Sequence, residues 1–181
     1  MDTQTPTGYT ILGFLALQPR SGYEIREAAR RSVQLFWGIS EGQLYPQLHH
    51  LHDSGLIEPL GDPTGPRSSQ QWGVTDTGRQ TLHEWLAAPS APIQMRDENL
   101  VKLMFSDQLG SEATLALLEE RRDKFALLVQ RIEAVVPGAH RPVSDEEAGL
   151  HGPGLVHDFT RRYASTALDW CRKAIRHGLE T

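Results

Sequence analysis

The stretch Ser40-Glu-Gly-Gln-Leu-Tyr-Pro-Gln-Leu-His-His-Leu51 predicts a short amphipathic helix with its own start signal. Ser40 followed by Gln43 is a capping box, in which two side chains satisfy free backbone N–H groups at a helix start. Leucines then recur at positions i, i+4 and i+7, which predicts one apolar face, and they are Leu44, Leu48 and Leu51. Gly55 is placed to end the helix in a left-handed conformation.

The segments on either side of this helix complete a small domain. We expect a first helix over residues 7–18 and a second that begins with a capping box at Ser21 and Glu24. Residues 56–60 and 68–74 predict two strands with a turn between them, and Thr75 caps a fourth helix. The order helix, helix, helix, hairpin, helix predicts a winged helix-turn-helix over residues 1–90.

Residues 91–181 predict a separate α-helical domain after a Pro-rich linker. We expect a helix over residues 97–107, a longer helix from Ser111 and a last helix from near Pro153. The longer helix carries an apolar seam, interrupted only by Arg122, that consists of Leu115, Leu118, Phe125, Val129, Ile132 and Val136. This seam is either an intramolecular core or a contact between two chains, and we favour a mixture of both. The predicted fold class is therefore mainly α with a small β-wing.

Composition and charge limit the functional classes. The net charge is −5, and residues 1–90 contain six Arg and no Lys against nine Asp and Glu, a balance of −3. This balance argues against DNA binding, although affinity for DNA needs only a local basic surface. A single cysteine, Cys171, cannot form an intramolecular disulfide. The sequence contains no membrane-spanning segment and no signal peptide, so we expect a cytoplasmic protein.

The polar face of the helix from Ser40 carries side chains that suit a DNA groove. Gln43, Gln47, His50 and part of Tyr45 lie opposite the leucines. Glutamine can pair bidentately with adenine, and Tyr and Ser hydroxyls commonly bind phosphates. The alternative is that these residues form an ordinary solvated helix face.

Four motifs together resemble the PadR-like family of transcriptional regulators. They are Leu12-Gly-Phe-Leu15, Ser21-Gly-Tyr-Glu-Ile25, Gly42-Gln-Leu-Tyr-Pro-Gln-Leu48 and Ser54-Gly-Leu-Ile57. Residues 72–78 and 96–105 extend the resemblance through the wing into the second domain. The resemblance implies a homodimer that binds double-stranded operator DNA, acts as a repressor and releases DNA when a small effector binds. We expect no enzyme activity and no cofactor.

The resemblance also implies which residues contact DNA. The carried-over positions are Tyr23 at the start of the second helix, Gln43, Tyr45 and Gln47 on the third helix, and Arg67, Ser68 and Ser69 at the wing tip. We add Ser40, His49 and His50 to this candidate set from their place on the third helix. The family usually has Lys or Arg at positions 49, 50, 69 and 70, where this chain has His49, His50, Ser69 and Gln70. We therefore expect a shallow salt dependence, and tighter binding as the histidines become charged at acidic pH.

Other sites have weaker support. Aromatic side chains that could surround an aromatic or phenolic effector are Phe36, Trp37, Phe159, Tyr163 and Trp170, although most such residues belong to a core. His49 and His52 are neighbours on a helix but lack a third metal ligand, so we predict no metal site. An enzyme and a winged-helix module that binds protein remain alternatives. No nucleophile elbow or phosphate loop supports the enzyme.

Overall fold

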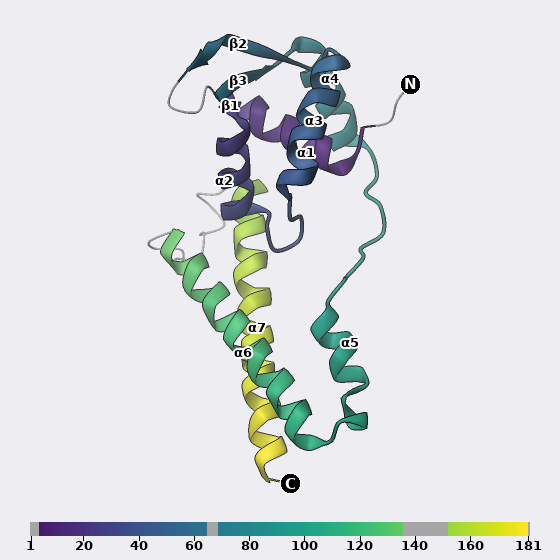
Figure 1. Cartoon of the computed structure of the whole chain (residues 1–181), viewed down its shortest axis with the longest axis vertical. Coiled ribbons are helices and arrows are strands. Elements are labelled where there is room, and N and C mark those ends of the chain that lie inside the picture. The colour runs from purple at the N-terminus through teal and green to yellow at the C-terminus, as the bar shows by residue number, and fades with distance from the viewer. Residues whose placement is uncertain (1–3, 65–68, 136–151, 181) are drawn as a thin grey trace, which may run out of the picture. The chain divides into compact units, whose positions relative to one another are not determined.

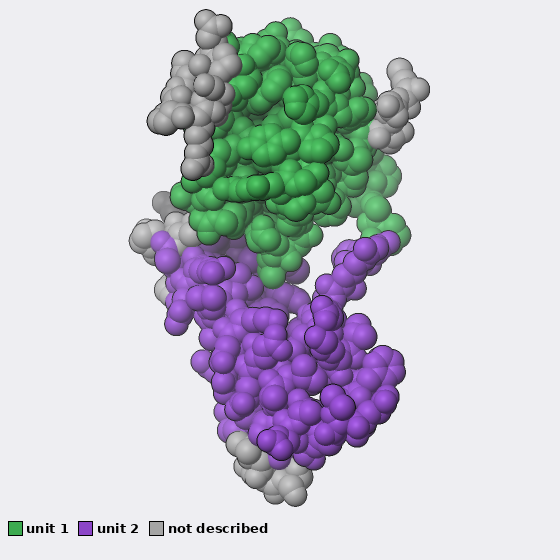
Figure 2. All heavy atoms as spheres, in the orientation of Figure 1, with its two compact units in different colours: residues 1–92 green, residues 93–181 purple. Residues whose placement is uncertain are grey.

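The computed structural model describes residues 4–64, 69–135 and 152–180. The chain forms two compact units, residues 1–92 and residues 93–181, which Figure 2 shows in different colours. Within the described ranges, no helix is both long enough and apolar enough to cross a bilayer.

The described residues of unit 1 form four helices whose starts are set by local hydrogen bonds. They are α1 (Pro6–Leu17), α2 (Gly22–Ser32), α3 (Glu41–Asp53) and α4 (Asp76–Ala87). Thr5 and Thr75 cap α1 and α4, because their hydroxyls accept from backbone N–H groups three residues on, at 3.1 and 3.0 Å. The capping box at Ser21 is confirmed: its backbone N–H donates to Glu24 at 2.7 Å, and its hydroxyl accepts from the Glu24 N–H at 3.3 Å.

A three-stranded antiparallel sheet forms the wing (Figure 1). Its strands are β1 (Arg20–Ser21), β2 (Ile57–Thr64) and β3 (Ser69–Val74), in the order β1-β3-β2. Ile57 pairs with Val74, and Pro59 lies on the edge strand β2, where its missing N–H costs least. The sequence did not predict β1, a two-residue strand that is defined only by its pairing with β3.

The core of unit 1 lies where α1, α2 and α3 meet the sheet. The leucine face of α3 is confirmed, since Leu44, Leu48 and Leu51 are all buried. They pack in one cluster with Ile11, Leu12, Leu15, Ile25 and Ile57. Burial of each such side chain contributes roughly 1.5–3 kcal/mol, so this face holds α3 in place and leaves its other side outward. Tyr9 and Trp85 stack with ring centroids 4.7 Å apart and join α4 to α1.

Unit 2 is helical, but its first helix is shorter than expected. It contains α5 (Glu98–Met104), the 3-10 turn η1 (Ser106–Gln108), α6 (Ser111–Val135) and α7 (Gly152–Glu180). The sequence predicted one helix over 97–107. The helix ends at Met104, and the 3-10 turn follows it. The Thr114 hydroxyl of α6 donates to the Ser106 hydroxyl at 2.8 Å, and Gly110, with φ of +85°, turns the chain into α6.

Helices α6 and α7 pack against each other, and three residues of the predicted seam lie in the cluster between them. Phe125, Val129 and Ile132 share a cluster with Ala164 and Leu168 of α7, and Leu118 is buried. Leu115 is half-buried, and Val136 lies outside the described residues. The seam therefore contributes to a core within one chain, and its contact with a second chain stays a prediction.

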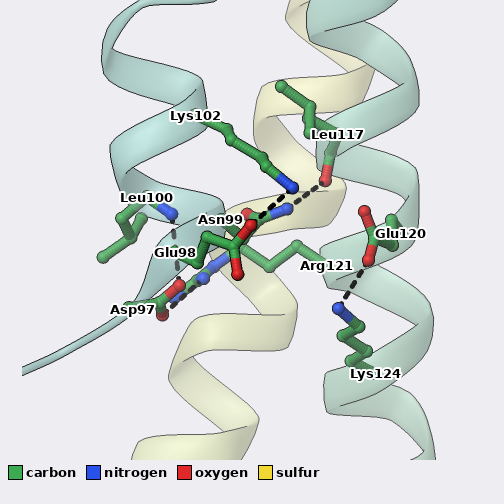
Figure 3. A network of polar contacts seen from close by, with 9 residues as sticks. All are labelled: Asp97, Glu98, Asn99, Leu100, Lys102, Leu117, Glu120, Arg121 and Lys124. Carbon is green, nitrogen blue, oxygen red and sulfur yellow. Dashed lines mark hydrogen bonds and ion pairs between the residues drawn. The ribbon is translucent and has the colours of Figure 1, made fainter.

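A buried ion pair joins α5 to α6 (Figure 3). Arg121 donates to Asp97, whose carboxylate also accepts from the backbone N–H of Leu100 at 3.1 Å and caps α5. The Asn99 amide donates to the Leu117 carbonyl at 3.1 Å. The sequence pattern had placed Arg122 in the seam, whereas the structure buries Arg121.

Candidate nucleic-acid interface

The outward face of α3 carries most of the expected DNA-contacting side chains. Gln43, Tyr45 and His49 are exposed, and Gln47 and His50 are half-buried. The ring of Tyr45 lies against the start of α2, where a Cβ on Gly22 would come within 2.9 Å of its Cε1 atom. Glycine at position 22 therefore permits the close approach of α2 to α3 that defines a helix-turn-helix.

Tyr23 at the start of α2 lies beside Arg26, which already forms an ion pair within the protein. Tyr23 is 54% exposed, and the Arg26 guanidinium carbon lies 5.3 Å from the centroid of its ring. Arg26 also forms an ion pair with Glu41, the first residue of α3. Arg26 and Glu41 are not among the residues predicted for the site, because only the fold brings α2 and α3 together.

The carboxamide of Gln43 is partly occupied by the helix cap. Its Oε1 atom accepts from the backbone N–H of Ser40 at 3.2 Å and from the Ser40 hydroxyl at 3.1 Å. A carbonyl oxygen has two lone pairs, so both are used within the protein. The amide N–H groups are what Gln43 can still offer to another molecule.

The residues before α1 contact α3, and no sequence pattern predicts this contact. The Thr5 hydroxyl donates to Oε1 of Gln47 at 2.9 Å, and Nε2 of Gln4 lies 3.2 Å from Nε2 of His50. Gln4 is 7% exposed. These pairs are separated by 42 and 46 residues, so no local pattern could reveal them.

The wing is tied to α2 by a carboxylate. Gln71 of β3 donates to Glu24 at 2.9 Å. The backbone N–H of Ser21, and then the Gln71 amide, hold the pKa of Glu24 below its usual value, which keeps the carboxylate charged. Ser69 pairs with Thr64 at the start of β3, and Arg67 and Ser68 lie outside the described residues.

Several arginines of unit 1 have partners within the unit. Arg30 and Arg31 contact Glu27, and Arg26 contacts Glu41. Arg79 donates to the carbonyl of Ala16 at 3.2 Å. These pairs add to the low count of basic residues in residues 1–90 and reduce the charge available for phosphates.

The aromatic residues proposed for an effector fall into two groups. Phe36 and Trp37 are exposed in unit 1. In unit 2, Tyr163 is half-buried against Phe125, with ring centroids 6.0 Å apart, whereas Phe159 and Trp170 are exposed. The buried residues of α7 lie on the neighbouring face of the helix, and they are Thr160, Ala164, Leu168, Cys171 and Ile175. In the part of the chain that the structure describes, no three His, Cys, Asp or Glu side chains gather as metal ligands would.

Comparisons with known proteins match both units. Residues 11–84 match the model of the transcriptional regulator PadR-like family, and residues 95–177 match that of the virulence activator alpha C-terminal domain. The negative transcriptional regulator PadR of Bacillus subtilis is 30% identical over 118 residues, which cover 64% of this chain and 65% of that protein.

Two solved structures of Bacillus subtilis PadR share the fold. The structure in complex with operator DNA has a TM-score of 0.76 at 24% identity and covers 96% of this chain and 99% of that one. The structure in complex with p-coumaric acid has a TM-score of 0.70 at 24% identity, with coverage of 94% and 97%. The matched family model and the curated relative assign residues 11–84 to the PadR-like family of transcriptional regulators, and the solved structures show that the chain shares that family's fold.

Proposed function

We propose that this chain binds operator DNA by placing α3 in the major groove, with Tyr23 and the wing against the backbone on either side. The observation that carries this proposal is the division of α3 into two faces. Leu44, Leu48 and Leu51 anchor one face in the core, and Gln43 and Tyr45 stand exposed on the other. The major groove is about 12 Å wide and admits a helix held in this way. The match to a relative solved with operator DNA supports the assignment.

A binding titration tests this proposal. Fragments of the region upstream of the gene would be tested by gel shift at low salt, with wild type and the double variant Gln43→Ala/Tyr45→Ala. We expect wild type to shift one fragment and the variant to bind it at least about tenfold more weakly, because both side chains would contact DNA. His83→Ala, an exposed position on α4, is the matched control. Failure of the folded wild type to shift any fragment would favour the protein-binding alternative.

We also propose that two copies associate through unit 2. Large apolar side chains stand exposed on α5 and just after it: Val101, Met104, Phe105 and Leu109. Exposed apolar patches of this kind mark interaction surfaces. A two-fold dimer would place two α3 helices about 34 Å apart, which predicts an inverted-repeat operator.

The oligomeric state tests the dimer. We expect wild type to sediment as a dimer at micromolar concentration and Met104→Glu, at a position 77% exposed, to weaken the dimer without unfolding the chain. Gln130→Glu adds the same charge at an exposed position of α6 and should remain a dimer. A wild-type monomer at this concentration would refute the proposal.

Repression relieved by a small aromatic effector is the remaining part of the proposal. The exposed aromatic side chains of both units, Trp37 and Trp170 among them, could stack on such a molecule. p-Coumaric acid, which is bound in a solved relative, is the first compound to test. We expect it to quench tryptophan fluorescence and to release bound DNA. Unchanged DNA affinity at millimolar p-coumaric acid would remove this effector while leaving the DNA-binding proposal intact.

A further inference from the structure

We infer that α3 presents hydrogen-bond donors to DNA and therefore selects guanine in preference to adenine where its glutamines contact base edges. This inference rests on the proposed DNA binding and specifies the bases that it would recognise. It follows from the hydrogen bonds that already occupy the two carboxamide oxygens, those of Gln43 and Gln47.

The first oxygen is used by the helix cap. Two donors of Ser40 point at Oε1 of Gln43, the backbone N–H and the hydroxyl. Turning this oxygen to a base would leave the Ser40 N–H at the helix start without its partner, which is costly. The carboxamide therefore offers its two N–H donors.

The second oxygen, that of Gln47, accepts from Thr5, the N-cap residue of α1. The Thr5 hydroxyl accepts from the Gly8 N–H at 3.1 Å, so its single proton is free to point at Oε1 of Gln47, 2.9 Å away. The same oxygen would lie 2.9 Å from a Cβ on Gly8. Oε1 of Gln47 is therefore turned toward α1 and packed against its backbone, and Thr5 acts as a positioning residue for Gln47.

The base edges differ in what such a side chain can bind. Adenine offers the N7 acceptor and the N6 donor, so bidentate recognition by glutamine needs the carboxamide oxygen. Guanine offers two acceptors, N7 and O6, which both suit an N–H₂ group. A glutamine whose oxygen already accepts a hydrogen bond from the protein thus loses the bidentate pairing with adenine that the residue type alone suggests.

Selection of bound sites from random DNA tests the inference through Thr5. The base pair that Gln47 contacts is defined as the one whose preference disappears in Gln47→Ala. We expect guanine there with wild type and with Thr5→Ser, which keeps the hydroxyl. Thr5→Val removes the hydroxyl and frees the carboxamide oxygen of Gln47. The ratio of adenine to guanine at this position among the selected sites should then rise by roughly fivefold or more.

A second variant, at position 47, leaves the helix cap of α1 unchanged. Gln47→Glu has the same shape but only acceptor oxygens, and we expect its preference to move to cytosine, whose N4 group donates. This result would support the inference even if Thr5→Val were too unstable to select. Adenine at the Gln47 position with wild type, or the same base with wild type and folded Thr5→Val, would overturn the inference. No enriched sequence with wild type would instead refute the proposed DNA binding.

Discussion

Arg121 of α6 donates from Nη1 to Oδ2 of Asp97 across 2.7 Å, and its side chain is only 7% exposed (Figure 3). The guanidinium carbon also lies 4.9 Å from the centroid of the Phe125 ring. A charge in this position needs its partner, because removal of one member of a buried pair leaves the other desolvated and unpaired. Asp97 thus holds α5 on α6 and neutralises a buried cation.

We predict that Asp97→Ala destabilises unit 2 by about 3 kcal/mol, the lower end of the usual cost of breaking a buried pair, since Asp97 is itself 22% exposed. Urea unfolding of the full chain, followed by circular dichroism at one fixed protein concentration, measures the loss. Glu98→Gln is the control, because Glu98 pairs with Lys102 at the surface, where an ion pair contributes little. If Asp97→Ala and Glu98→Gln lost the same free energy of unfolding, leaving Arg121 buried without its partner would cost no more than breaking a surface ion pair.

The same pair predicts a pH dependence. Burial raises the pKa of Asp97, but the hydrogen bonds from Arg121 and the Leu100 N–H outweigh burial and hold the pKa below its ordinary value. The folded state therefore binds fewer protons than the unfolded state near the ordinary Asp pKa, about 3.9. The stabilisation from the pair is fully present above that pH and is lost as the pH falls through the folded-state pKa. Between pH 5 and 3, wild type should lose more stability than Asp97→Asn, as measured by urea midpoints; parallel losses would contradict the assignment.

Local patterns predicted the helices well because their signals lie within a few residues of one another. The Ser21 and Glu24 box and the three leucines of α3 depend only on helical geometry. Strand β1 was missed because its two residues have no pattern of their own and gain order from Trp72 and Gln71. The contact of Thr5 with Gln47 was missed for the same reason. The side chains on the outward face of α3 could thus be predicted, but not the hydrogen bonds that their atoms already make within the protein.

Two glycines should respond in opposite ways to alanine. A Cβ on Gly78, in the first turn of α4, would lie 2.1 Å from the carbonyl oxygen of Leu56, so the backbone must shift. We expect Gly78→Ala to destabilise unit 1 by about 3 kcal/mol. A Cβ on Gly13, inside α1, would have no described atom within 4 Å, and Gly13→Ala should stabilise by up to about 1 kcal/mol. Thermal unfolding of both variants measures the difference, and a shift of the same sign in both would disprove this account.

The ion pair between Arg26 and Glu41 predicts how the salt dependence of DNA binding can be changed. Arg26 lies beside Tyr23, at the start of α2 where we expect the phosphate backbone, but Glu41 neutralises it. Glu41→Gln removes the competing carboxylate, so Arg26 can neutralise a phosphate and release a counterion.

In anisotropy titrations over a series of NaCl concentrations, log K against log salt should become steeper by about 0.9 per protomer in Glu41→Gln, and affinity at low salt should rise. Glu84→Gln removes an exposed carboxylate from α4 and serves as the control, with an unchanged slope expected. If Glu41→Gln binds more tightly but with the wild-type slope, the gain comes from reduced repulsion alone, and Arg26 makes no phosphate contact. If the slope became steeper in both Glu41→Gln and Glu84→Gln, the cause would be the general change in net charge. Only a steeper slope in Glu41→Gln alone places Arg26 at the DNA backbone.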